Sequence, residues 1–204
     1  MDELAAQPNR VRVSCVAGNS RRQQVADYCQ QQWNVSAEFA SVKEECAGVK
    51  QAYHVKERLG VDRWLGLLAA HKQLGACLLL SCGSAVTVDL LLANGEHLGG
   101  YIVPGIAMMH NSLFHGTDAV KVDVSRDVED LLPGRDTVEA VNKGVIVLVK
   151  SLVDHAAEVF EENSGDRPQI LITGGDGEIM QRFLSPDSIY NPYLVLDGLA
   201  VALP

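Results

Sequence analysis

The most distinctive pattern along the chain is a long apolar segment, residues 76–93, that carries small polar residues at its middle. Asp89 lies inside this segment, and a carboxylate at the centre of a membrane-spanning helix costs roughly 2.5–3.5 kcal/mol. Gly83-Ser84 interrupts the apolar residues, and Asn94-Gly95 after them is a strong hairpin signal. The pattern therefore predicts a three-stranded antiparallel meander rather than a membrane span, with strands at about 76–82, 85–92 and 96–103.

The apolar periodicity outside the meander predicts helices. Apolar residues three and four apart follow Asp136, which is an N-cap with Glu139 in capping-box position, and they predict a long helix. Another helix is expected near the N-terminus, capped by Asn19 or Ser20. A buried strand in the segment QILIT, a glycine turn, a helix, and a last short strand and helix complete the chain. The order of strands and helices indicates an α/β (α+β) fold.

Composition narrows the class of partner. The 204 residues fit one large domain or two small ones, and the net charge of −9 argues against nucleic acid or an anionic membrane as the main partner. The five cysteines are odd in number and form no Cys-x-x-Cys pair, which disfavours a disulfide framework or a zinc site. The first residues are acidic and polar, unlike a signal peptide. We therefore expect a cytoplasmic protein.

Three polar motifs can be interpreted chemically, and each also has a purely structural explanation. Gly83 and Ser84 would let backbone N–H groups approach phosphate oxygens, or would only form a tight turn. Asp62 falls in the first turn of a helix expected from about Val61, where a carboxylate also stabilises the helix dipole. Gly174-Gly175-Asp176 follows a buried strand. This segment would let the backbone approach a nucleotide, or it would only form a tight strand-to-helix turn. Taken singly, these residues leave the alternatives open.

Considered in their order, the blocks LGVDRW, SCGSAVTVDL, GGYIVPG and ILITGGD resemble those of the type III pantothenate kinase family, close to the Bvg accessory factor group. The resemblance covers about residues 12–200. It implies ribonuclease H-like lobes of the actin/Hsp70/sugar-kinase superfamily, with an incomplete first lobe at 1–75 and a second lobe at 76–204. It also implies ATP-dependent phosphorylation of pantothenate to 4′-phosphopantothenate, the first step of coenzyme A biosynthesis, by a homodimer that uses Mg²⁺.

The resemblance also implies roles for single residues. Asp62 would be the general base that accepts the proton of the pantothenate hydroxyl, since phosphoryl transfer needs mainly an oriented nucleophile and neutralised phosphate charge. Arg63 would bind the pantothenate carboxylate with two parallel N–H groups. The other pantothenate-site residues would be Tyr53, Gly60, Thr117 and Thr137. The ATP and phosphate site would contain Gly83, Ser84, Thr87, Gly174 and Gly175, with Asp89 as a further candidate on the face that Thr87 occupies.

Two departures from the family pattern bear on activity. Ser81 stands where the family usually has an aspartate that holds a monovalent cation, which weakens Ser81 as a metal site and brings a K⁺ or NH₄⁺ requirement into question. The first phosphate loop of the family, D-x-G-N-T, has no counterpart, because CVAGNS lacks the aspartate and leads into a helix. Three hypotheses follow: an active pantothenate kinase, a catalytically impaired paralogue acting as a regulatory accessory factor, and another phosphotransferase of the superfamily. Gly60-x-Asp62-Arg63 favours the first over the third. The missing loop and Ser81 favour the second, and they leave the activity of the 204-residue chain open.

Overall fold

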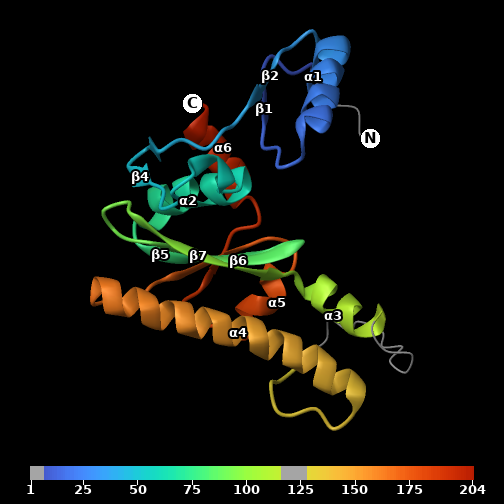
Figure 1. Ribbon diagram of the computed structural model, residues 1–204, viewed down its shortest axis with the longest axis vertical. Coiled ribbons are helices and arrows are strands. Elements are labelled where there is room, and N and C mark those ends of the chain that lie inside the picture. Colours follow the sequence, from blue (N-terminus) through green and yellow to red (C-terminus); the bar gives the residue numbers. More distant parts are fainter. Residues whose placement is uncertain (1–6, 116–127) are drawn as a thin grey trace.

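The structure is a computed structural model that describes residues 7–115 and 128–204. Its centre is a five-stranded mixed sheet (Figure 1). In order across the sheet, the strands are β7 (His97–Pro104), β6 (Ala85–Leu91), β5 (Cys77–Cys82), β8 (Ile170–Thr173) and β9 (Ile189–Tyr190). The pairs β7–β6 and β6–β5 are antiparallel, whereas β8 runs parallel to β5 and β9 parallel to β8.

The meander predicted from the sequence is confirmed, with every strand end within one residue of its expected position. Gly83 and Ser84 form the tip of the β5–β6 hairpin, where the Gly83 N–H donates to the carbonyl of Ala85 at 3.0 Å. Gly95 adopts a positive φ of 83° in the next turn, a conformation that glycine reaches without a steric penalty. A meander extended on one side by parallel strands is the arrangement of a ribonuclease H-like lobe, so the predicted α/β class is also confirmed.

Helices cover both faces of the sheet (Figure 1). One face packs against α2 (Val61–Leu74) and α6 (Leu194–Ala202), which also pack against each other. The opposite face packs against α4 (Thr137–Ser164) and α5 (Gly177–Gln181), and α3 (Ile106–His115) follows the end of β7. None of the helices in the described ranges is long and apolar enough to cross a membrane.

The two helical layers explain the long apolar segment. β5 lies at the centre of the sheet, so successive side chains enter two different cores: Leu79 packs with the α2 side, and Leu78 and Leu80 pack with the α4 side. A strand covered on both faces is apolar at nearly every position. On the α2 face, Ser81 follows Leu79 at the end of the strand. The polar residues Ser81, Thr87 and Asp89 inside the apolar segment therefore lie on the face of the sheet that packs against α2.

The long helix α4 begins as the sequence predicts. The Asp136 carboxylate accepts a hydrogen bond from the backbone N–H of Glu139 at 2.9 Å, which confirms the cap. Its inner face is buried on the sheet. Its outer face also carries apolar side chains, since Val147 and Leu148 are 41% and 49% exposed.

The N-terminal part is a small separate layer of structure. β1 (Val11–Val13) and β2 (Ala37–Phe39) pair in parallel around α1 (Asn19–Trp33). The predicted cap of α1 is wrong: Gly18 is the N-cap, and no side chain bonds to the helix end. The chain reaches α2 through the elements β3 (Glu45–Cys46), β4 (Val49–Lys50) and the 3₁₀ turn η1 (Lys56–Arg58).

Candidate active site

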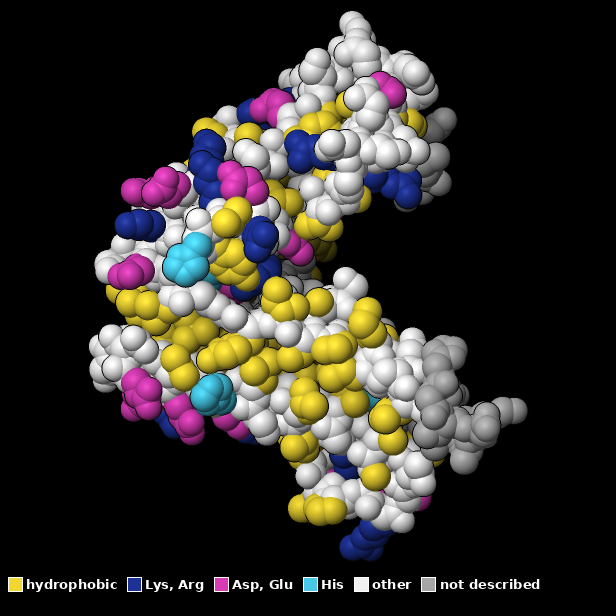
Figure 2. Space-filling model, viewed as in Figure 1, with side chains coloured by type: hydrophobic (Ala, Val, Ile, Leu, Met, Phe, Trp, Pro, Cys, Tyr) yellow, Lys and Arg dark blue, Asp and Glu magenta, His cyan; other side chains and the backbone are white. Residues whose placement is uncertain are grey.

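A cleft of about 110 Å³ opens where the N-terminal end of α2 faces the tip of the β5–β6 hairpin. Residues that are distant in the sequence meet there, and most of them are site residues expected from the sequence. Its polar lining consists of Asp62, Arg63, Ser81, Gly83, Ser84, Thr87, Asp89 and Thr173. In the space-filling view the molecule is hollowed between its N-terminal part and the sheet (Figure 2).

Asp62 lies in the first turn of α2 with its side chain exposed. Its Oδ1 accepts a hydrogen bond from the backbone N–H of Arg63 at 2.9 Å. A Cβ on Gly60 would lie 2.6 Å from the same oxygen, so glycine at the N-cap leaves room for the carboxylate. The end of the helix therefore holds an ionisable, accessible acceptor at the mouth of the cleft.

The hairpin tip is held by two other glycine motifs. The Gly105 N–H donates to the Ser84 carbonyl at 3.1 Å, and a Cβ on Gly105 would lie 2.6 Å from that oxygen. From the other side, Gly174 has a φ of 90° and packs against the backbone of Cys82, whose carbonyl accepts from the Asp176 N–H at 3.2 Å. The glycines allow three backbone segments to approach closely. The tip is therefore positioned by backbone packing on both sides.

Three hydroxyl side chains form the floor of the cleft. Ser81 pairs across the sheet with Thr87 on one side and with Thr173 on the other. The Thr87 Oγ1 is buried and has no hydrogen-bond partner among the described residues. Since buried polar atoms are normally paired, this hydroxyl is available to a ligand in the cleft. The floor is uncharged where a carboxylate at Ser81 would have been negative.

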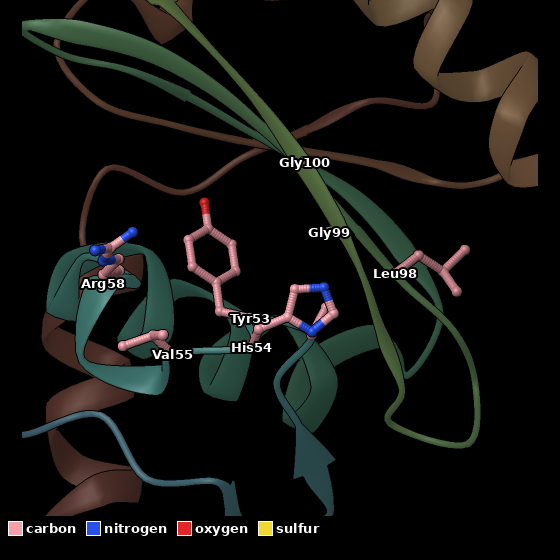
Figure 3. A pocket seen from close by; sticks show the side chains of 8 residues that line it. Tyr53, His54, Val55, Arg58, Leu98, Gly99 and Gly100 are labelled. Atoms are coloured by element: carbon pink, nitrogen blue, oxygen red, sulfur yellow. The ribbon is translucent and has the colours of Figure 1, made fainter.

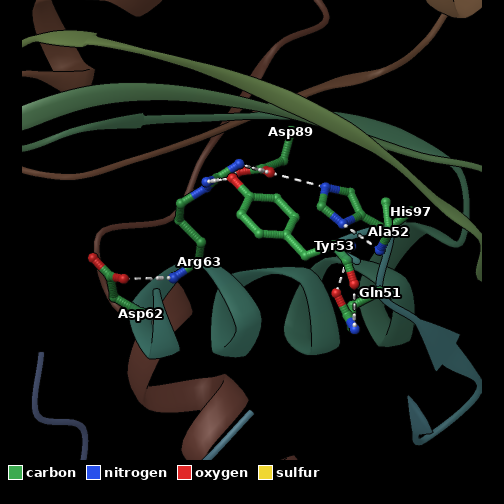
Figure 4. A network of polar contacts seen from close by, with 7 residues as sticks. All are labelled: Gln51, Ala52, Tyr53, Asp62, Arg63, Asp89 and His97. Carbon is green, nitrogen blue, oxygen red and sulfur yellow. Dashed lines mark hydrogen bonds and ion pairs between the residues drawn. The ribbon is translucent and has the colours of Figure 1, made fainter. Parts of the chain in front are cut away.

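A buried polar network lies beside the cleft (Figure 4). The Arg63 guanidinium donates through Nε and Nη2 to the two carboxylate oxygens of Asp89, at 3.0 and 2.5 Å, and through Nη1 to the Tyr53 hydroxyl at 2.6 Å. His97 Nε2 lies 2.9 Å from Asp89 Oδ1, and the Ala52 N–H donates to His97 Nδ1 at 3.4 Å. The Arg63 guanidinium, which the family resemblance assigns to the substrate carboxylate, thus already donates three hydrogen bonds within the protein.

The environment of the network fixes its charge state. Burial lowers the pKa of Arg63, but the hydrogen bonds and charge of Asp89, with a smaller effect of Tyr53, outweigh burial and raise it above its ordinary value. Arg63 is therefore a permanent cation.

Burial and the charge of Asp176 raise the pKa of Cys82, at the base of the hairpin, to about 12. That thiol stays protonated and is not a nucleophile.

A second cavity, of about 540 Å³, adjoins the network through Tyr53 (Figure 3). It lies between the segment before α2 and the start of β7, where Gly99 and Gly100 leave one wall without side chains. The charged and aromatic lining residues are Tyr53, His54 and Arg58.

The comparisons with known proteins identify the family. The family model of type III pantothenate kinase matches residues 1–159. A type III pantothenate kinase of Chromohalobacter salexigens is 41% identical over 161 residues, which are 78% of this chain and 58% of that relative. One of Pseudomonas fluorescens is 36% identical, over 100% of this chain and 85% of the relative. The chain belongs to the type III pantothenate kinase family.

A solved structure agrees with the fold. A conserved Campylobacter jejuni protein, described as a Baf family transcriptional activator, aligns with a TM-score of 0.58 and 25% identity, covering 87% of this chain and 76% of that one. The matched part of this chain spans 58% of the Chromohalobacter kinase, less than two thirds of that relative.

Not every residue that the family resemblance suggests lies in the cleft. Gly174 and Gly175 follow Thr173 at the end of β8, beside the hairpin. Thr137 is exposed at the start of α4, on the opposite face of the sheet, and Thr117 lies outside the described residues. No motif in the sequence marks His97, which belongs to the adjoining polar network, and Thr173, which lines the cleft, is marked only as part of the ILITGGD block. The pairing of Ser81 with Thr173 requires the strand order, which a single sequence does not give.

Proposed function

We propose that this chain transfers the γ-phosphoryl group of ATP to the hydroxyl of pantothenate, forming 4′-phosphopantothenate at the start of coenzyme A biosynthesis. Membership of the type III pantothenate kinase family gives the reaction. The observation that carries the proposal for this chain is the cleft, in which one accessible carboxylate, Asp62, faces the glycine hairpin tip and the hydroxyl floor. Phosphoryl transfer requires a correctly positioned proton acceptor and hydrogen-bond donors, neutral or cationic, for the phosphate oxygens.

In the proposed mechanism, Asp62 accepts the proton of the pantothenate hydroxyl as its oxygen bonds to the γ-phosphorus. The bond from phosphorus to the bridging oxygen breaks, and ADP leaves with that electron pair. The backbone N–H of Ser84, the Ser84 hydroxyl and the Thr87 hydroxyl are proposed to donate to phosphate oxygens, and Gly83, which has no side chain, is proposed to leave room for the phosphates at the hairpin tip. The adenosine is proposed to lie near Gly174 and Gly175.

The family uses ATP, and a divalent ion accompanies it. The described residues hold no group of three or more His, Cys, Asp or Glu side chains that would bind a metal on their own. Mg²⁺ is commonly held by phosphate oxygens, waters and one or two protein oxygens, which suits this lining. We propose Mg²⁺ bound with ATP above the hydroxyl floor. Ser81, a neutral oxygen, is proposed to leave the reaction independent of K⁺ or NH₄⁺.

Pantothenate is proposed to lie along the N-terminal end of α2. Its hydroxyl would meet Asp62, with Gly60 leaving space beside it. Its carboxylate would accept from the remaining N–H groups of Arg63 and from Tyr53. Thr137 is proposed to reach the pantothenate site from a second subunit, because it starts a helix on the far face of the sheet. Thr117, outside the described residues, is proposed as a further pantothenate-site residue by the family resemblance alone.

We further propose a homodimer and no nucleic-acid or membrane partner. Hydrophobic side chains gather in a band over the sheet half of the molecule (Figure 2). The exposed apolar side chains of the described residues include Leu148 and Val147 on α4, Ile102 on β7 and Met108 on α3. Exposed apolar area of this kind is typical of a subunit interface. We also propose that residues 1–75 and 76–204 form two lobes. The protein is proposed to be cytoplasmic.

The decisive experiment replaces Asp62 by Asn. We expect kcat to fall roughly 10²–10⁴-fold, the usual contribution of a general base, while the melting temperature stays unchanged because the residue is exposed. Asp154→Asn is the matched control, since Asp154 is an exposed carboxylate on α4 away from the cleft. Undiminished turnover in Asp62→Asn would show that another group is the base. Pantothenate binding without any phosphorylation by the wild-type chain would favour the accessory-factor alternative.

A further inference from the structure

Asp89 is a carboxylate with no exposed surface and both oxygens engaged. Oδ2 accepts from Arg63 Nε, and Oδ1 accepts from Arg63 Nη2 and lies 2.9 Å from His97 Nε2. The side chains of Arg63 and Asp89 are 6% and 0% exposed, so the ion pair is shielded from water. A buried pair of this kind holds its members in one geometry, because separating them leaves an uncompensated charge.

The second nitrogen of His97 fixes how the ring takes part. The Ala52 N–H donates to Nδ1, so Nδ1 carries no proton and Nε2 carries the one that it donates to Asp89. The His97 ring also stacks on the Tyr53 ring, with centroids 6.5 Å apart and planes 11° from parallel. His97 thereby connects Asp89 with the segment that carries Tyr53.

Gly100 and the Tyr53 ring pack closely against the ion pair. A Cβ on Gly100 would lie 2.8 Å from Asp89 Oδ1 and 3.0 Å from Arg63 Nη2. The Arg63 guanidinium also lies over the Tyr53 ring, 5.5 Å from its centroid. Arg63 and Tyr53 are the two groups proposed to bind pantothenate. Asp89 thus fixes the Arg63 guanidinium through the ion pair, and His97 contacts the Tyr53 ring by stacking.

We propose that Asp89 and His97 are positioning residues of the pantothenate site, which hold the Arg63 guanidinium and the Tyr53 ring ready for the substrate and act only through them. This inference rests on the proposed function. It predicts that damage to the pair weakens use of pantothenate and spares use of ATP, because the hairpin tip and the hydroxyl floor have other supports.

A double-mutant cycle tests the inference, with initial rates measured by ADP release against pantothenate and against ATP. We expect Asp89→Asn to raise the KM for pantothenate about tenfold or more and to leave the KM for ATP within about twofold. In an Arg63→Met background, the same change should alter the KM for pantothenate by less than about twofold, because groups that act through one another are not additive. Additive effects, or equal changes in both KM values, would overturn the inference.

His97 supplies a second test that does not depend on the ion pair surviving mutation. His97→Phe should raise the KM for pantothenate, and His97→Gln, whose amide N–H can donate to Asp89, should restore most of it. Val153→Ala, in the core on the α4 side, lowers stability without touching the site and should leave both KM values unchanged. A KM in His97→Phe equal to that of the wild type would contradict a positioning role.

An NMR measurement separates this inference from the proposed reaction. The Arg63 Nε–H signal should be sharp and protected in the wild-type protein, broadened in folded His97→Phe and retained in His97→Gln. An unchanged signal in His97→Phe would overturn the role of His97 whatever the enzyme phosphorylates. Absence of pantothenate phosphorylation by the wild type, with these signals behaving as expected, would instead overturn the proposed function alone.

Discussion

Replacing Gly105 by Ala tests how the hairpin tip is positioned. A Cβ at this position would lie 2.6 Å from the Ser84 carbonyl oxygen and 2.8 Å from the Ser84 carbonyl carbon. The Gly83 carbonyl oxygen would lie closer still. An ordinary carbon–oxygen contact is about 3.3 Å, so the tip or Gly105 must move by more than about 0.7 Å. Gly105 has no positive φ, so the effect is steric rather than conformational. Overpacking of this size typically costs about 1–3 kcal/mol of stability.

The kinetic effect should exceed the effect on folding. A displacement near 1 Å at a group that binds the reacting phosphate can lower a rate about 100-fold, so we expect kcat/KM for ATP to fall roughly 10- to 100-fold. Urea unfolding and ADP release measure the two effects separately. Gly18→Ala is the control, because nothing lies within 4 Å of a Cβ there, and its kinetics should match the wild type. Gly105→Ala with kcat/KM for ATP within about twofold of the wild type would refute the reasoning.

Two further predictions concern the floor of the cleft and the outer face of α4. The phosphorylation rate of the wild type should be the same in K⁺ and Na⁺ buffers. The rate of Ser81→Asp should depend on K⁺, because a carboxylate beside the phosphates needs a counter-ion. A K⁺ requirement in the wild type would contradict this prediction. Leu148→Glu should convert a dimer into a monomer in light scattering, since Leu148 is 49% exposed on α4, whereas a wild-type chain that is already monomeric would end the dimer proposal.

Local patterns were sufficient to predict most of the fold. The β5–β7 meander follows from apolar blocks and turn residues that lie next to one another, and the start of α4 follows from a capping box only four residues long. The α1 cap failed because Gly18 makes no side-chain bond, so no capping residue in the sequence marks the position. The cleft itself was predictable only as a set of motifs, since the sequence does not contain the distances between them.

The Asp89–His97 contact shows why such a site cannot be deduced from alternation along a strand. Asp89 pairs with Gly100 across the β6–β7 ladder, and His97 lies three positions before Gly100, which in a regular strand puts the two residues on opposite faces. The register shifts between Leu90 and Leu91, so that Leu91 pairs with His97, while Gly99 takes a φ of 110°. A bulge of this kind turns the following side chains to the other face, as is common beside active sites. It brings His97 to the face that Asp89 and Arg63 share, and Gly99, whose positive φ a residue with a side chain rarely adopts, makes that bulge possible.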